Sequence, residues 1–300
     1  MRVLLTGANG FLGYYLAEIL LQRGHDVIAT GRGDCRLPFR DHASFHYVVM
    51  DFTDPYRVHD VFTHYQPEAV LHSGAMTRVD DCEVHQWDAY VANVEGTLTL
   101  LSNAEEHHCH FIFLSTDFVF DGSRGMYTEK DQPSPVNFYG KTKWEAEQAV
   151  MEYPFDWSIV RTVHVYGEPR NNNPNFLFML KQKLERGESY VVVTDQFRTP
   201  TYVGDLVKGI TAILEKKAKG IFHLSGRDLL TPYDMATRTA RLLGLDLNLI
   251  QPATAITFTQ AGRRPPRTGF VIQKARKELE FDPVSFDEGL KLVFSSSSKR

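Results

Sequence analysis

The 300-residue sequence has few cysteines and no long apolar run. Its three cysteines, Cys35, Cys82 and Cys109, are odd in number and widely spaced. This pattern argues against a disulfide framework and favours reduced thiols in the cytoplasm. No apolar stretch approaches the length of a membrane span, and the chain reaches Gly7 before a signal-peptide core could form. We therefore expect neither secretion nor a membrane partner.

The sequence also lacks an excess of positive charge. It contains 33 lysines and arginines against 37 acidic residues, which gives a formal net charge of −4. The two signs are interspersed and form no basic stripe, so nucleic acid is excluded as an expected partner. With 43% hydrophobic and 23% charged residues, the composition is that of a globular protein. Its length suffices for a large domain and a smaller lobe.

Short runs rich in β-branched residues alternate with helical patterns through the first half of the chain. The predicted strands cover residues 3–6, 27–30, 47–50, 69–72, 111–115 and 158–163. Such alternation is typical of an α/β fold, here a Rossmann-type doubly wound parallel sheet with crossover helices. We assign residues 1–165 to this NADP-binding domain.

The regular alternation ends after residue 165, where a polar segment at 168–174 begins. We expect residues 166–294 to form mainly a smaller substrate-binding lobe, part of which returns to the first domain. Its predicted elements are a helix through residues 176–184, a strand pair at 190–194 and 220–225, and a helix at 231–243. The low-complexity segment 295–300 is predicted to be a disordered tail.

Three glycines at a spacing of three follow the first predicted strand. Gly7 permits a tight turn, Gly10 lets the backbone approach a pyrophosphate, and Gly13 lets the following helix pack closely on the strand. The helix N-terminus adds unpaired amides and the positive end of the helix dipole. We therefore predict a dinucleotide-binding turn, with a ligand-free glycine turn as the alternative. The turn also contains Asn9, Phe11 and Leu12.

The second predicted strand ends in Thr30-Gly31-Arg32-Gly33. An NAD-dependent enzyme places an acid here to hold the ribose hydroxyls, whereas the guanidinium of Arg32 would favour the 2′-phosphate of NADP. We expect NADP(H) to be the preferred cofactor. NAD(H) stays an alternative because Asp34 lies two residues further on, and a simple surface arginine is the remaining interpretation.

Tyr139 and Lys143 stand four residues apart at the start of a predicted helix. Both can address one site, while Lys141 points away. A tyrosine hydroxyl, with an ordinary pKa of about 10, needs nearby positive charge for acid–base work at neutral pH. Lys143 and the oxidised nicotinamide would supply that charge. Thr116 follows the strand at 111–115, at the sheet edge where ligands gather, and is predicted to hydrogen-bond the substrate carbonyl.

The run His107-His108-Cys109-His110 has the residue types of a metal site. Contiguous residues cannot easily converge on one ion, and the spacing matches no usual zinc pattern. We therefore predict an exposed helix end here, and no metal site.

Together these motifs resemble the dTDP-4-dehydrorhamnose reductase family of the extended short-chain dehydrogenase/reductase superfamily. The resemblance rests on STDFVFDG at 115–122, Tyr127-x-Glu129 and PVNFYGKTK at 135–143, and it continues in order at 161–162, 165–167, 175–176, 195–197 and 200–201. It covers nearly the whole chain. It implies a nucleotide-sugar substrate, a dTDP-6-deoxy-hexulose whose C4 ketone is reduced with NADPH to dTDP-rhamnose or a close analogue.

The resemblance also assigns roles to individual residues. The family's catalytic threonine, tyrosine and lysine correspond to Thr116, Tyr139 and Lys143. The implied cofactor contacts are Asp51 and Phe52 near the adenine, Ser73, Gly74, Ala75 and Thr77 beside the dinucleotide, and Asn93 as a support for the active-site lysine. The implied substrate contacts are Val79, Asp117, His164, Asn175, Phe176 and Arg198.

Two departures from the family pattern fall in the substrate region. His164 stands where the family usually has a tryptophan, and Arg198-Thr199 stand where it often has small residues. Both leave the identity of the sugar and nucleotide open. Two rival functions also stay open: a nucleotide-sugar epimerase or dehydratase that consumes no reductant, and a regulatory subunit similar to the beta subunit of methionine adenosyltransferase. Whether the chain forms a homodimer is likewise open.

Overall fold

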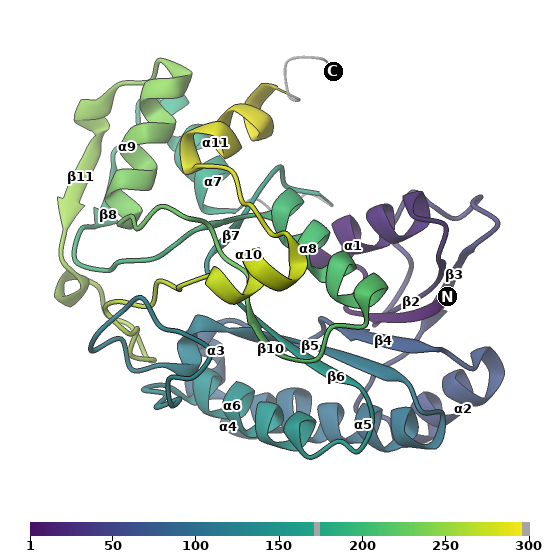
Figure 1. Ribbon diagram of the computed structural model, residues 1–300. Coiled ribbons are helices and arrows are strands. Elements are labelled where there is room, and N and C mark those ends of the chain that lie inside the picture. Colours follow the sequence, from purple (N-terminus) through teal and green to yellow (C-terminus); the bar gives the residue numbers. More distant parts are fainter. Residues whose placement is uncertain (171–174, 296–300) are drawn as a thin grey trace.

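A computed structural model describes residues 1–170 and 175–295, and its larger part is built on one sheet (Figure 1). The strands of this sheet are β1 (Arg2–Thr6), β2 (Asp26–Gly31), β3 (Phe45–Val49), β4 (Ala69–His72), β5 (His110–Thr116), β6 (Trp157–Thr162) and β10 (Gly220–His223). They lie in the order β10-β6-β5-β4-β1-β2-β3, and every neighbouring pair is parallel. The predicted Rossmann-type α/β fold is confirmed.

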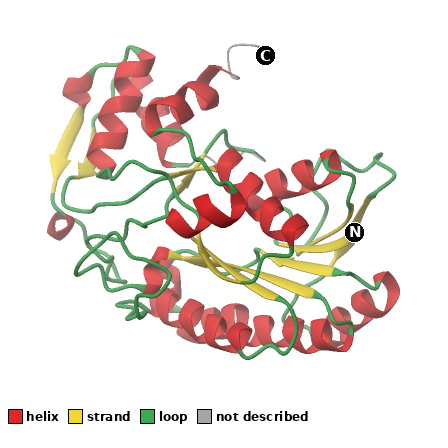
Figure 2. Cartoon of the chain, viewed as in Figure 1, coloured by secondary structure: helices red, strands yellow, loops and turns green. Residues whose placement is uncertain are grey.

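Helices cover both faces of this sheet, as Figure 2 shows. On the lower face in Figure 1 lie α2 (Pro55–Tyr65), α5 (Gly96–Glu106) and α6 (Phe138–Met151), and on the upper face lie α1 (Phe11–Gln22), α8 (Val203–Lys216) and α10 (Gln273–Leu279). Successive strand residues serve opposite faces. Leu4 of β1 joins the core on one side of the sheet and Leu5 joins the core on the other. Burial on both faces explains why the strands are almost continuously apolar.

Short elements join the main ones. They are α3 (Val79–Val84), α4 (Gln86–Tyr90) and a π-helical turn (Val91–Glu95) between β4 and α5, and the paired strands β7 (Val165–Tyr166) and β9 (Thr201–Tyr202). Within the described ranges, no helix is both long enough and apolar enough to cross a membrane.

The smaller lobe, at the upper left of Figure 1, has apolar clusters of its own. It contains α7 (Phe176–Glu185), β8 (Tyr190–Val193), α9 (Pro232–Leu243), β11 (Ile250–Ala253) and α11 (Phe286–Ser295). The predicted helix at 231–243 is confirmed as α9, which begins with a capping box between Thr231 and Asp234. The predicted pairing of the strands at 190–194 and 220–225 is wrong. β8 pairs with β11, while β10 extends the large sheet and covers the edge of β6 that would otherwise be unpaired.

The chain therefore returns to the large sheet after the lobe has begun, through α8, β10 and α10. We propose that the cofactor-binding domain comprises residues 1–165 together with these returning segments. Ser295 belongs to α11 rather than to a tail. The rest of the predicted tail, residues 296–300, and residues 171–174 of the predicted polar loop lie outside the described part of the chain.

The predicted exposed helix end at 107–110 is right for the first half of this run and wrong for the second. His107 caps α5 and His108 is exposed, whereas Cys109 and His110 are buried. α5 ends at Glu106, and His108 turns the chain with a φ of +54°. Cys109 and His110 are buried because the next strand enters the middle of the sheet at this point. The His110 ring lies 2.9 Å from the Ser158 hydroxyl on β6, and burial lowers the pKa of His110 to about 4.

Candidate active site

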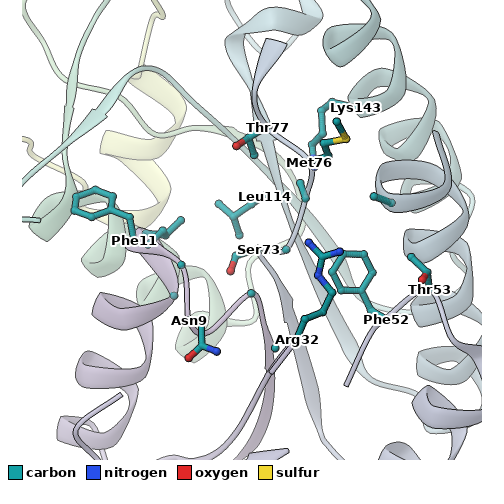
Figure 3. A pocket seen from close by; sticks show the side chains of 18 of the residues that line it. Asn9, Phe11, Arg32, Phe52, Thr53, Ser73, Met76, Thr77, Leu114 and Lys143 are labelled. Carbon is teal, nitrogen blue, oxygen red and sulfur yellow. The ribbon is translucent and has the colours of Figure 1, made fainter. Parts of the chain in front are cut away.

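A cleft of about 1230 Å³ opens at the carboxyl ends of the central strands (Figure 3). In the sheet, β1 lies between β2 and β4, so the chain crosses to opposite sides of β1 in its two halves. Such a switch point is where open α/β sheets bind their ligands. The cleft is lined by the ends of β1, β2 and β4, the first turn of α1 and the start of α6.

The glycine turn forms the floor of this cleft. Gly7 has a φ of +69°, a backbone conformation that residues with a side chain rarely adopt. A Cβ at this position would also lie only 2.8 Å from the backbone of Gly74, so no other residue fits here. The first regular hydrogen bond of α1 runs from the Tyr14 amide to the Gly10 carbonyl, over 3.1 Å. The amides at 11–13 therefore precede the regular helical bonds and can bind an anion.

The opposite wall comes from the segment after β4. The Ser73 hydroxyl donates to the Thr6 carbonyl over 2.6 Å, and the Gly74 amide donates to the Thr6 hydroxyl over 3.1 Å. These bonds hold the wall against the end of β1. Ala75, Thr77, Asp51 and Phe52 also line the cleft.

Arg32 and Arg36 both line the cleft and are both exposed. Figure 3 shows the Arg32 guanidinium at the same end of the cleft as Phe52 and Thr53. The sequence argument identified Arg32 and missed Arg36, although the spacing of four between them was visible. It also missed Trp87, which lines the cleft from α4 and has no local motif.

The cleft has the features that a nicotinamide dinucleotide requires. Its lining combines the two exposed arginines, the first turn of α1 with its unbonded amides, and the buried amine of Lys143. The buried Ser115 hydroxyl also lines the cleft, and no other described residue hydrogen-bonds to it. A buried polar atom of this kind is normally satisfied by a partner, so it fits a bound polar ligand. Every residue expected at the cofactor lines the cleft except Asn93.

Asn93 instead lies behind the cleft wall. Its amide oxygen accepts from the Met76 amide over 2.8 Å, and its nitrogen donates to the Met76 carbonyl and the Thr142 hydroxyl, each over 3.0 Å. It thus connects the segment after β4 to α6, one residue before Lys143.

Tyr139 and Lys143 lie on the first two turns of α6. Asn137 caps this helix by accepting from the Gly140 amide over 2.8 Å, which sets where the helix begins. Lys141 is exposed, whereas Lys143 is 2% exposed and its Nζ lies 3.8 Å from the centroid of the Phe113 ring. The spacing of four therefore brings the phenol and the amine to one face, as predicted.

Burial governs the acidity of both groups. Burial raises the pKa of Tyr139 above its usual value, an effect that its hydrogen bond with Thr116 opposes. Burial lowers the pKa of Lys143 to about 7, and the Glu147 carboxylate opposes that change. The predicted lowering of the Tyr139 pKa by Lys143 is absent from the protein alone, because desolvation dominates and Lys143 is not among the groups that shift this pKa.

A second cavity of about 310 Å³ meets the cleft at Tyr139. The two spaces share Thr77, Tyr139 and His164. The expected residues Thr116, Val79, Asp117 and Arg198 line the second cavity, together with Phe118, Gln196, Pro232 and Arg264, which the sequence argument did not identify. The phenol thus stands between a space suited to a dinucleotide and a space on the side of the smaller lobe.

Charges in this second cavity are paired within the protein. Arg198 lies 3.7 Å from the Asp117 carboxylate and donates over 2.7 Å to the Pro265 carbonyl. Burial raises the pKa of Asp117, and the Arg198 guanidinium opposes the shift. Arg264 donates to Asp80 over 2.7 Å, which holds the pKa of Asp80 down at about 2. The arginines therefore tie the 261–267 loop across the cavity.

His164 opens onto both spaces and onto a third cavity of about 180 Å³ that Asn175 and Phe176 also line. Its backbone has a φ of +36°, which is unusual for a residue other than glycine. Protein atoms around the ring lower the pKa of His164 below its usual value, and the Arg198 guanidinium adds to this effect, although the residue itself is exposed at the open cavities. His164 is therefore neutral at pH 7. Asn175 caps α7 and donates to the Gly167 carbonyl over 2.7 Å.

A parallel sheet with a glycine turn at its switch point, and a tyrosine and a lysine one helical turn apart beside it, define an extended short-chain dehydrogenase/reductase. The family described as the RmlD substrate binding domain matches residues 1–298. The chain belongs to this family.

Several known proteins are similar over most of their length. A dTDP-4-keto-6-deoxy-D-glucose reductase from Streptomyces niveus is 34% identical over 94% of this chain and 92% of its own. A dTDP-4-dehydrorhamnose reductase from Bacillus anthracis, solved in complex with NADP, is 29% identical with a TM-score of 0.87 and covers 98% of this chain and 99% of its own. The methionine adenosyltransferase 2 subunit beta of Bos taurus is 30% identical over 84% of this chain and 75% of its own.

Proposed function

We propose that the protein reduces the C4 ketone of a nucleotide-linked 6-deoxy-hexulose, with NADPH as the reductant. One observation carries the proposal: Tyr139 belongs to both the large cleft and the second cavity. A proton donor at that junction can serve a carbonyl in the second cavity while a dinucleotide occupies the cleft. Similarity to the Streptomyces niveus and Bacillus anthracis reductases supports the reaction class, with dTDP-4-dehydrorhamnose or a close analogue as the substrate.

The residues divide the chemistry between them. Bound NADPH would supply the hydride. The Thr116 hydroxyl and the Tyr139 hydroxyl hold the ketone oxygen, and Tyr139 donates its proton to that oxygen as negative charge develops there. The raised pKa keeps the Tyr139 phenol protonated and ready to donate. Lys143, when protonated, stabilises the phenolate that remains.

A regulatory role is the second candidate, because the methionine adenosyltransferase 2 subunit beta is as similar in sequence as several reductases. The complete set of Thr116, Tyr139 and Lys143 around open space favours catalysis. An epimerase or dehydratase would use the same groups but would return the hydride to its product.

The deciding experiment incubates the purified protein with NADPH and a panel of dTDP- and UDP-linked 4-keto-6-deoxy-hexoses. We expect NADPH oxidation at 340 nm in stoichiometric amount to the alcohol formed, with at least one dTDP sugar. Sugar conversion without NADPH consumption would instead identify an epimerase or dehydratase. Failure to convert any sugar, together with co-purification of a methionine adenosyltransferase, would favour the regulatory role.

A further inference from the structure

The loop that follows β2 is tied to the glycine turn by side chains from two other segments. The Asn9 amide nitrogen donates to the Asp34 carbonyl over 3.0 Å and to the Tyr47 hydroxyl over 2.7 Å. The Asn9 amide oxygen accepts from the Arg36 amide over 2.9 Å. The Tyr47 hydroxyl donates to the Gly33 carbonyl over 2.9 Å. We call these four hydrogen bonds the Asn9–Tyr47 clamp.

The clamp determines which side chains of the loop face the cleft. Asn9 binds backbone groups of both Asp34 and Arg36, so it fixes the direction in which successive side chains leave the loop. Arg32 and Arg36 line the cofactor cleft. Asp34 instead lines a separate hollow of about 360 Å³, next to Cys35 and Tyr47. The clamp thus separates the two cations from the acid of the same loop.

Gly31 provides the space that the clamp needs. A Cβ at Gly31 would lie 3.0 Å from the Tyr47 hydroxyl and 3.3 Å from the Asn9 amide nitrogen. Both contacts are tighter than a side chain normally allows, so even alanine would press on the two clamp residues. Tyr47 is positioned by the sheet itself, because it pairs in register with Ala29 between β2 and β3.

The placement of Arg32 and Arg36 in the cleft, with Asp34 outside it, favours a ligand that carries a phosphate at this position. Two guanidinium groups in the cleft offer several N–H donors to the three oxygens of a phosphate monoester. A carboxylate in the same place would bind the ribose hydroxyls of NAD and repel that phosphate. We propose that Arg32 and Arg36 together bind the 2′-phosphate of NADP(H), and that the Asn9–Tyr47 clamp creates this selectivity by holding Asp34 out of the cleft. The inference rests on the proposed use of NADPH.

The test measures dissociation constants for NADPH and NADH through the fluorescence of the bound reduced nicotinamide, so it needs no sugar. Tyr47→Phe removes the hydroxyl but keeps the ring. We expect it to weaken NADPH binding about tenfold or more, the loss of roughly one charge-assisted contact, and to change NADH binding less than about twofold. Arg36→Ala should give the same selective loss, and Gly31→Ala should resemble Tyr47→Phe.

Two controls sharpen the result. Tyr233→Phe, which removes a hydroxyl in the smaller lobe, should leave both constants unchanged. Adding Asp34→Asn to Tyr47→Phe should recover part of the NADPH affinity, because the released side chain would no longer carry a negative charge.

An equal loss of affinity for NADPH and NADH, or no loss of NADPH affinity in Tyr47→Phe and Arg36→Ala, would overturn the proposed role of the clamp in selectivity. The proposed reductase activity would be unaffected by that result. Absence of NADPH binding by the unchanged protein would overturn both.

Discussion

At the level of single residues, the site combines groups whose pKa values are shifted from their ordinary values in water by burial. Tyr139 is kept protonated, and Lys143 is brought to a pKa of about 7. His164 carries a positive φ, a conformation that costs about 1–3 kcal/mol for a residue with a side chain and is often found at functional sites. Tyr139 and His164 line both cavities, and Lys143 lines the large cleft beside them.

Tyr139→Phe is expected to lower kcat about 10²–10⁴-fold, because it removes the proton donor and leaves the ring in place. The dissociation constant for NADPH should stay within about twofold, since the cleft keeps its other lining residues. Steady-state assays combined with fluorescence titration measure both values. A variant with near-normal turnover would refute the role of Tyr139.

The pH dependence of kcat/KM for NADPH should follow Lys143. The pKa of Lys143 is lowered to about 7, so its ammonium is present below that pH and is lost as the pH rises through it. We therefore expect kcat/KM to fall above about pH 7, because this ratio reports the free enzyme. Lys143→Arg, which stays charged, should be slower but flat between about pH 6 and 9. The same fall in Lys143→Arg would exclude Lys143 as its source.

At the level of elements, α6 connects Tyr139 and Lys143, the proposed catalytic pair, to the sheet. Its N-terminus is set by the Asn137 cap, and its third turn is anchored by Glu147. The Glu147 carboxylate and the Arg161 guanidinium of β6 form an ion pair at 2.6 Å, with side chains 0% and 1% exposed. The Asn137 cap and the Glu147–Arg161 ion pair together fix the position of α6, and therefore the positions of the Tyr139 phenol and the Lys143 amine.

Asn137→Ala should reduce the free energy of unfolding by about 1 kcal/mol, the usual cost of losing a helix N-cap. It should also reduce turnover, because Tyr139 lies two residues into that helix. Ser285→Ala offers a matched control. Ser285 exchanges hydrogen bonds with Glu288 at the start of α11, away from the cleft. Urea unfolding should show the larger loss for Asn137→Ala, because Asn137 also donates to the Arg263 carbonyl over 2.7 Å. Equal turnover in both variants would contradict a positioning role for Asn137.

Arg161→Met should destabilise the protein by about 3–5 kcal/mol, because it leaves the Glu147 carboxylate buried without a counter-charge. The double variant Arg161→Met with Glu147→Met should be clearly more stable than Arg161→Met alone, since neither charge then remains. Urea unfolding compares the three proteins. If the double variant lost at least as much stability as the single one, uncompensated charge would not be the cause.

At the level of the whole molecule, two units with separate cores meet around Tyr139 and His164. The sheet domain contributes the cleft, while Gln196, which follows β8, and Pro232, the first residue of α9, help to line the second cavity. The returning segments α8, β10 and α10 make the chain pass between the units more than once. The lining of the cleft comes entirely from residues 7–165, whereas the second cavity also draws on residues as late as Arg264.

NADPH should stabilise the folded protein by mass action. At a free concentration of 100 times Kd, the expected gain is about 2.7 kcal/mol, and Tm should rise with the logarithm of the NADPH concentration. Differential scanning fluorimetry measures the shift. Tyr139→Phe should show the same shift, whereas a Tm independent of NADPH would contradict cofactor binding in the cleft.

Local sequence determined much of this protein. The glycine spacing predicted the cleft, the Tyr139–Lys143 spacing predicted that both side chains line it, and the β-branched runs predicted the parallel sheet. Each of these features depends on neighbours within about one helical turn or one strand. Thr116 was identified for the same reason, since it lies at the carboxyl end of a strand, as the last residue of β5.

Only the tertiary structure decided the rest. The partner of β10, the burial of Cys109 and His110, and the place of Asn93 behind the cleft wall depend on residues far away in the chain. The same holds for the acidity of Lys143 and for the clamp that turns Arg36 toward the cleft and Asp34 away from it. Desolvation and long-range hydrogen bonds arise from packing, and packing has no signature in the local order of residues.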